Sequence, residues 1–106
     1  MPTIDEFRAL NLRVAKIVEV TNHPNADRLY VLKVDLGAEQ RQIVAGVKQY
    51  YTPEQLVGKS VIVVAGLQPA MLRGVESQGM MLAVGTGTDV VLLTTEKPVP
   101  TGSQVT

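Results

Sequence analysis

Donor side chains that could bind a ligand gather between two predicted strands. Residues 61–65 form an apolar, β-branched run that predicts a buried strand, and residues 79–84 predict a second one. Gly66 and Pro69 break the pattern between them, because neither residue suits the interior of a paired strand. The predicted loop carries Arg73, Ser77 and Gln78. Loops on a rigid strand scaffold commonly bind ligands, so this arrangement indicates a binding edge on a β-barrel.

No group of residues has the composition of a catalytic or metal centre. The only histidine, His23, precedes Pro24 in a predicted turn, and there is no cysteine to pair with it. Asp27 and Asp35 lack metal-ligand spacing. The G-T-G-T run at residues 85–88 has neither a following lysine nor a helix pattern, so a hairpin turn is the better interpretation. The sequence therefore predicts a protein that is not an enzyme and has no metal and no cofactor.

The overall charge argues against a strongly basic nucleic-acid binder but leaves room for a local basic face. Ten lysine and arginine residues balance ten acids among 106 residues, a length that predicts one domain, residues 1–106. Residues 41–75 carry four cations and one acid, whereas residues 76–106 carry one cation and three acids. No apolar run approaches the roughly 18 residues of a membrane span, and the N-terminal residues lack a signal-peptide pattern. Because cysteine is absent as well, we expect a cytoplasmic protein.

Strands dominate the predicted secondary structure, with two short helices. Thr3 with Glu6, and Thr52 with Gln55, match the capping box that begins a helix, which predicts helices at about residues 4–9 and after Pro53. The predicted strands are residues 12–20, 29–36, 41–45, 61–65, 79–84 and 90–94.

Alternation along these strands predicts which residues face the interior. In the first strand, Val14, Val18 and Val20 fall on one face. In the second, the apolar set is Tyr30, Leu32, Val34 and Leu36. Five main strands with a short helix between the third and fourth make an all-β protein with the arrangement of an OB-fold barrel.

Five motifs, in the same order and spacing, resemble the tRNA-binding domain family. They are L-R-V-A-K-I at residues 12–17, H-P-N-A-D-R-L at 23–29, V-D-L-G at 34–37, R-Q-I-V-A-G at 41–46 and L-R-G-V-E-S-Q-G-M at 72–80. The resemblance extends from about Ile4 to the end of the chain. This family occurs as stand-alone proteins, at the C-terminus of many methionyl-tRNA synthetases and in synthetase-associated cofactors.

The resemblance implies an OB-fold that binds tRNA by shape, near its elbow and with little sequence preference. It also implies action in cis or in trans to an aminoacyl-tRNA synthetase, with the methionyl enzyme as the expected one. The short stand-alone members form homodimers through the N-terminal helix and the C-terminal tail, so a homodimer is implied here too. No catalysis is implied.

The residues that the resemblance implies for tRNA binding are cations, polar groups and one methionine, which could pack on a base or sugar. Arginine and lysine would meet phosphates, while hydroxyl and amide groups could reach a phosphate, a sugar or a base edge. The predicted residues are Arg13, Lys16, Lys33, Lys48, Arg73, Ser77, Gln78 and Met80. The alternative for Arg13 and Lys33 is a solvated strand face, and for residues 77–80 it is a turn that determines the fold.

The sequence departs from the family pattern just before Arg73. Gly66, Ala70 and Met71 stand where the family usually has Asn, Arg and Lys. Each lost phosphate contact removes about one unit from the salt dependence of binding. These substitutions also leave an apolar rim, which is typical of a protein contact. A protein-interaction or assembly module with weakened RNA binding is therefore the alternative function.

Overall fold

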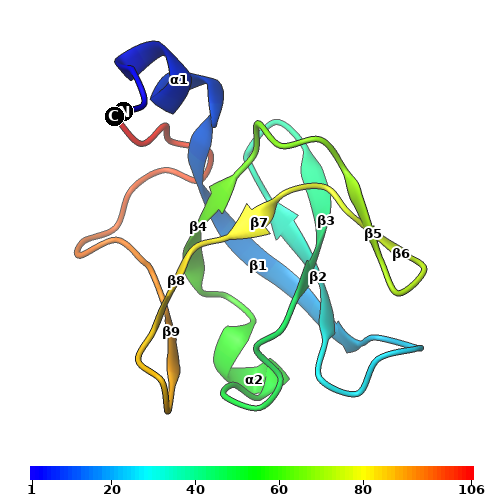
Figure 1. Ribbon diagram of the computed structural model, residues 1–106. Coiled ribbons are helices and arrows are strands. Elements are labelled where there is room, and N and C mark those ends of the chain that lie inside the picture. The colour runs from blue at the N-terminus through cyan, green and yellow to red at the C-terminus, as the bar shows by residue number, and fades with distance from the viewer.

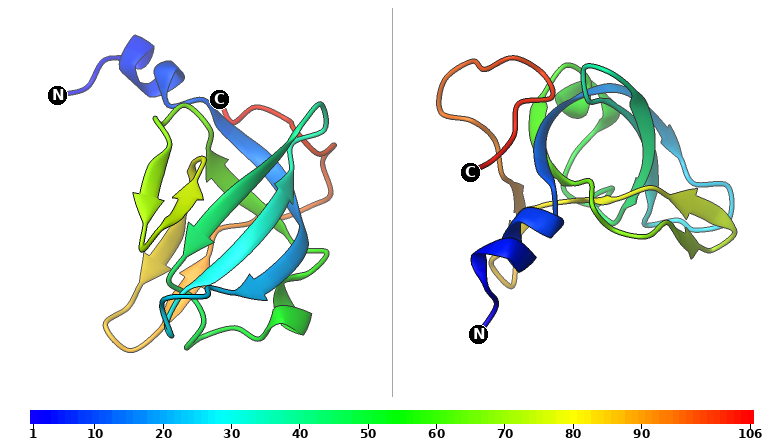
Figure 2. Two further views of the ribbon diagram at one scale, coloured as in Figure 1. Left: turned by 90° about the vertical axis from the view of Figure 1, so that its right-hand side faces the viewer. Right: turned by 90° about the horizontal axis from the view of Figure 1, so that it is seen from above.

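The centre of the structure is a five-stranded antiparallel sheet that curls into a nearly closed barrel (Figures 1 and 2). The computed structural model describes all residues from 1 to 106. In spatial order the strands are β3 (Gln40–Ala45), β2 (Tyr30–Asp35), β1 (Leu12–Asn22), β4 (Ser60–Val64) and β7 (Met80–Met81). The backbone N–H of Gln78 donates to the carbonyl of Gln42 at 2.7 Å, which links β3 to the chain entering β7. The predicted all-β, OB-fold barrel is confirmed.

Both predicted helices form, and each begins with its predicted capping box. α1 (Ile4–Ala9) follows Thr3, and α2 (Pro53–Leu56) follows Thr52 and lies between β3 and β4. Leu56 of α2 is fully buried and covers one end of the barrel. Neither helix has the length and apolar character needed to cross a membrane.

The core is made by alternate residues of the strands, with one irregularity. The inward set on β2 is the predicted one, and Tyr30, Leu32 and Val34 are all buried. On β1 the predicted interior face is wrong, because the core cluster contains Ala15 and Ile17, which alternate with Val14 and Val18. A bulge then shifts the pairing with β2 between Ile17 and Glu19. Ile17 and Val20 therefore both face the core, while Val18 is exposed.

The segment predicted as a loop, residues 66–78, instead contains a small β-hairpin outside the five-stranded sheet. β5 (Ala70–Leu72) pairs with β6 (Val75–Ser77), and the turn consists of Arg73 and Gly74. Both turn residues have positive φ, 54° and 87°. Positive φ at both positions is the geometry of a tight two-residue hairpin turn. The predicted strand at residues 79–84 also divides, into β7 and β8 (Ala83–Gly85). β8 pairs with β9 (Val90–Leu92) across the predicted turn at residues 85–88.

The C-terminal tail lies along the part of β1 that β2 leaves uncovered. Gly102 donates its N–H to Val14 O at 2.7 Å, and Val105 donates to Leu12 O at 2.9 Å. The tail thereby pairs a strand edge that would otherwise present free N–H and C=O groups. Gly102 has φ of +91°, and a Cβ there would overlap the carbonyl oxygen of Leu36.

Gly102→Ala is therefore expected to lower the free energy of unfolding by about 3 kcal/mol, because it adds a steric overlap to an unfavourable φ. Gly87→Ala is the matched control, since Gly87 has φ of +92° but no atom within 4 Å of the added Cβ. We expect a cost of about 1 kcal/mol for the control. Urea unfolding of both variants measures the difference, and equal losses would show that the tail does not press on Leu36.

Candidate nucleic-acid interface

The hairpin β5–β6 is fastened to the loop between β1 and β2 by a buried histidine. His23 Nδ1 accepts a hydrogen bond from the Asn25 N–H at 2.9 Å. The proton of the neutral ring must therefore be on Nε2, which donates to Leu72 O at 2.8 Å. Asn25 adds a second link, from its Nδ2 to Arg73 O at 3.2 Å. His23 thus acts as a clamp that sets the position of the hairpin.

This clamp presents Arg73 at the tip of the hairpin. The Arg73 side chain is exposed, and its single hydrogen bond, from Nη2 to Asn25 O, is long at 3.4 Å. Arg73 and Arg28 line the same shallow notch, together with Asp27. Arg28 was not among the residues predicted from the sequence, although it stands within the H-P-N-A-D-R-L motif. Two guanidinium groups at one notch suit the bidentate recognition of phosphate.

Ser77 and Gln78 lie at the base of the hairpin, and the hydroxyl of Ser77 does not reach the surface. Ser77 Oγ accepts from the Val44 N–H and donates to Gly79 O, both at 2.9 Å. Gln78 Oε1 accepts from the Gln42 N–H at 2.9 Å. These bonds join β6 to β3, and they engage the Ser77 hydroxyl and the Gln78 side-chain carbonyl within the chain.

Arg13 is likewise engaged inside the chain. Its Nε donates to Asn11 Oδ1 at 2.8 Å, and its Nη1 donates to Gly102 O at 3.1 Å. The side chain is half-buried and holds the C-terminal tail against β1. The bond to Gly102 exists because the C-terminal tail returns to this strand, which sequence alternation does not show.

The remaining predicted residues lie on the outside of the barrel. Lys16 and Lys33 are exposed, and Lys33 pairs with Glu19 at 3.7 Å. An exposed ion pair of this kind is weak and leaves the cation able to exchange partners. Lys33 is also the cross-strand partner of Gln42, whose Nε2 donates to Glu76 O in the hairpin at 2.8 Å. Lys33 and the hairpin therefore share the outer face of β2 and β3.

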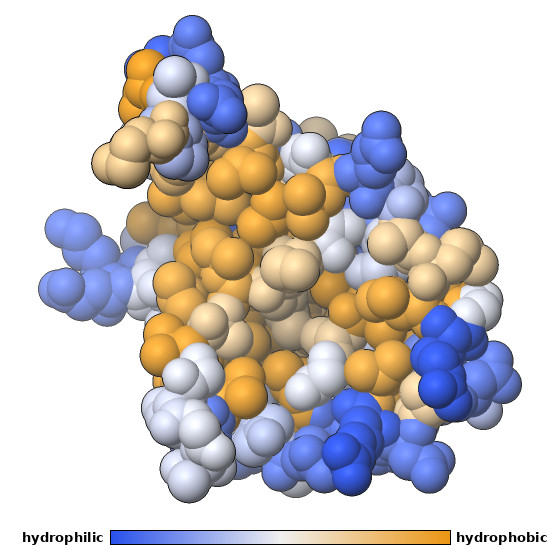
Figure 3. Space-filling view, in the orientation of Figure 1, coloured by the Kyte–Doolittle hydropathy of each residue, from blue (hydrophilic) through white to orange (hydrophobic).

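Lys48 follows β3 and is half-buried, while Met80 on β7 is exposed. Met80 belongs to a wider set of exposed apolar side chains on the hairpin and its flanks. The set also contains Leu67, Met71 and Leu72. Figure 3 shows a broad apolar surface in front of the barrel, bordered by hydrophilic side chains. The candidate interface thus combines scattered cations with exposed apolar side chains, and Arg73 is its exposed cation at the tip of the hairpin.

Comparison with known proteins identifies the family. The tRNA binding domain family matches residues 12–104. The methionine–tRNA ligase of Thermococcus kodakarensis is 58% identical over 97% of this chain, and that of Clostridium tetani is 53% identical over 97%. The chain spans only 14% and 16% of the length of these two ligases.

Solved structures agree with the sequence matches. A methionyl-tRNA synthetase related protein from Pyrococcus horikoshii superposes with a TM-score of 0.90 at 35% identity, covering 99% of this chain and 97% of that one. The chaperone CsaA from Bacillus anthracis superposes with a TM-score of 0.87 at 27% identity, covering 100% and 99%. This chain therefore belongs to the tRNA binding domain family.

Proposed function

We propose that this chain binds tRNA through its shape, with little sequence preference and no catalysis of its own. The observation that carries the proposal is the hairpin β5–β6, which the His23 clamp holds rigidly with Arg73 exposed beside Arg28. Lys16, Lys33 and Lys48 extend the cationic surface, and Met80 offers an apolar contact to a base or sugar. Ser77 and Gln78 position the hairpin, and Arg13 positions the tail, so these three support the interface from within.

The proposed role is to raise the hold of a synthetase on tRNA, in cis or in trans, in the cytoplasm. The methionyl enzyme is the favoured partner, because ligases for methionine contain a segment more than half identical to this chain. The direct test compares folded tRNA with the same tRNA unfolded by heating without magnesium. Folded tRNA should bind more tightly in a filter assay, and equal binding of both forms would exclude recognition of shape.

A homodimer is the proposed assembly, because α1 buries no residue in the monomer. In Figure 2 this helix projects from the barrel next to the C-terminal tail. A six-residue helix is far below the about 12–15 residues that isolated helices need, so a partner surface would add to the stability of α1. Ile4 is exposed, and α1 and the tail together line a groove that includes Phe7 and Val105. A second copy of the same two elements would cover both.

Ile4→Asp is expected to weaken this dimer about a hundredfold, since a two-fold interface loses the buried isoleucine twice. Val57→Asp is the control, because Val57 is also an exposed apolar residue but follows α2 at the other end of the barrel. Sedimentation equilibrium measures both dissociation constants. A wild-type chain that stays monomeric at high micromolar concentration would refute the dimer.

Restoring the cations that this chain lacks should tighten tRNA binding. Ala70 and Met71 are exposed on β5, beside Arg73. Ala70→Arg with Met71→Lys should raise affinity about tenfold and steepen the salt dependence by about 1.5 units. The matched control is Ala83→Arg with Val84→Lys, an exposed pair on β8. If fluorescence anisotropy finds equal effects for both pairs, the hairpin does not face the RNA.

The apolar surface favours a second candidate, a protein-interaction or assembly module with weakened RNA binding. Met71 is 64% exposed and Met80 is 53% exposed, which is unusual for large apolar side chains. A pull-down with the methionyl-tRNA synthetase of the same organism, repeated after ribonuclease treatment, tests it. Capture that survives ribonuclease but is lost in Met71→Lys would favour this candidate, whereas capture that needs RNA would favour the first.

A further inference from the structure

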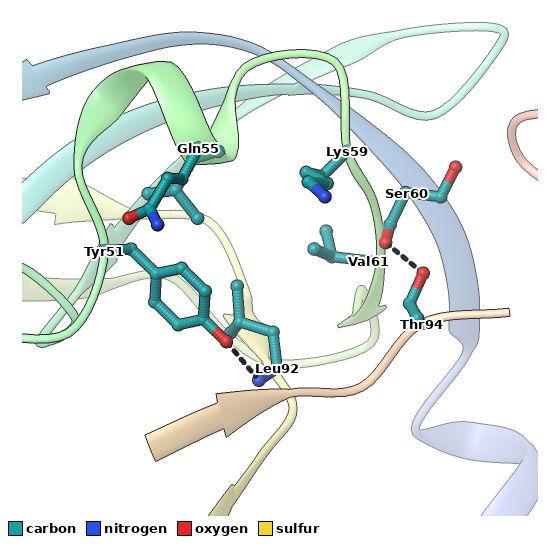
Figure 4. Close-up of a pocket in the computed structure, with 8 residues that line it drawn as sticks. Tyr51, Gln55, Lys59, Ser60, Val61, Leu92 and Thr94 are labelled. Atoms are coloured by element: carbon teal, nitrogen blue, oxygen red, sulfur yellow. Dashed lines mark hydrogen bonds between the residues drawn. The ribbon is translucent and has the colours of Figure 1, made fainter. Parts of the chain in front are cut away.

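A pocket of about 230 Å³ lies between α2, the start of β4 and β9, away from the hairpin β5–β6 (Figures 1 and 4). Tyr51 forms one wall of the pocket. Lys59 lies across the pocket from Tyr51, just before β4. The floor is apolar and consists of Leu56, Val61 and Leu92. This volume is below that of pockets for drug-sized ligands, so it suits a group about the size of one nucleobase.

The walls of the pocket are fixed by hydrogen bonds before any ligand arrives. The Leu92 N–H donates to Tyr51 Oη at 3.1 Å, and Thr94 Oγ1 donates to Ser60 O at 2.7 Å. Tyr30 Oη, from inside the barrel, donates to Tyr51 O at 2.8 Å. These bonds connect the β9 segment and Tyr51 to the barrel. Because the side chains are already ordered, little conformational entropy is lost when a ligand binds.

The polar groups of the pocket define the charge of its ligand. Lys59 takes part in none of the three salt bridges of the chain, and no acidic residue lines the pocket. Gln55 Oε1 accepts from the Thr52 N–H, which leaves the Gln55 amide N–H groups free to donate. Without a carboxylate the site cannot balance a metal ion or the ammonium of an amino acid. One cation with amide donors and an apolar floor suits a flat neutral ring joined to an anionic group.

We propose that this pocket binds a nucleotide, with the base against the apolar floor and the phosphate at Lys59. A free nucleoside monophosphate and an unstacked nucleotide of a folded RNA both present this chemistry. Lys16 connects the pocket to the proposed RNA surface, because it is the cross-strand partner of Ser60, one of the lining residues. If the bound nucleotide belongs to an RNA, the inference rests on the proposed function. If it is a free nucleotide, the inference is independent of that function.

The first test titrates the four ribonucleoside monophosphates into the ¹⁵N-labelled chain. The backbone amide signals of Tyr51, Lys59, Leu92 and Thr94 should shift, and less so with nucleosides or inorganic phosphate. Lys59→Gln should weaken nucleotide binding about fivefold. Lys97→Gln is the control with the same change of charge, because Lys97 is exposed and does not line the pocket.

The second test repeats the measurement with tRNA to identify the source of the nucleotide. Shifts of the pocket amides by tRNA, and displacement of a monophosphate by tRNA, would assign the site to RNA. Binding of monophosphates that tRNA does not disturb would assign it to a free nucleotide, even if tRNA does not bind the chain at all. The proposal is overturned if neither ligand shifts these amides, or if inorganic phosphate shifts them as strongly as the nucleotides.

Discussion

Arg73→Asn is expected to weaken tRNA binding about fivefold and to reduce the slope of its salt dependence by about one unit. The physical reason is the loss of one exposed guanidinium at the tip of a rigid hairpin. Asparagine is chosen because Arg73 has φ of 54°, a conformation that asparagine adopts more readily than alanine. The side chain makes one long hydrogen bond, so the melting temperature should change little.

Two further variants separate charge from geometry at this position. Arg73→Lys keeps the cation and should retain most of the affinity, with a salt slope like that of the wild type. Lys97→Asn removes an exposed cation beyond β9 and should leave affinity unchanged. Unchanged binding by Arg73→Asn in an anisotropy titration would remove the hairpin tip from the RNA contact.

His23→Ala is expected to destabilise the fold by about 2–3 kcal/mol and also to weaken tRNA binding. Alanine cannot replace either hydrogen bond of the buried ring, so the Asn25 N–H and Leu72 O lose their partners. The hairpin β5–β6 then loses the link that fixes Arg73. Urea unfolding measures the stability, and amide hydrogen exchange should show faster exchange in β5 and β6 than in β2.

His23→Asn distinguishes the two bonds of the clamp. An asparagine side chain can accept from the N–H two residues ahead, as the His23 ring does from Asn25. It is too short to reach Leu72 as well. We expect an intermediate loss of stability, with exchange in the hairpin as fast as in His23→Ala. Protection of the hairpin equal to that of the wild type would show that another contact positions it.

The sequence predicts the barrel well, because its signals are local. The capping boxes at Thr3 and Thr52 involve residues three apart, and the alternation in β2 follows from one strand with one buried face. The bulge in β1 escapes prediction, since Val18 is as apolar as the valines that face the core. Only the pairing with β2 determines which of them is left outside.

The site is harder to predict than the fold, because long-range contacts decide it. Ser77 is a plausible RNA donor in the sequence, but its hydroxyl is held by Val44, 33 positions away. Arg13 is a plausible phosphate contact until the C-terminal tail returns and takes its Nη1. The hairpin turn at Arg73 cannot be predicted from the sequence, because the first position of such a turn normally has asparagine, aspartate or glycine.

A titration of tRNA at several salt concentrations tests the central claim most directly. Binding should be present at low salt, and log K should fall linearly with log salt at a slope of about −3 to −4. This slope corresponds to about four or five cations, each worth about 0.7–0.9 units. The cations in question are Arg28, Arg73 and the lysines at 16, 33 and 48. No binding at low salt with micromolar protein would contradict the proposed tRNA binding. The apolar surface would then favour the alternative function, a protein-interaction module.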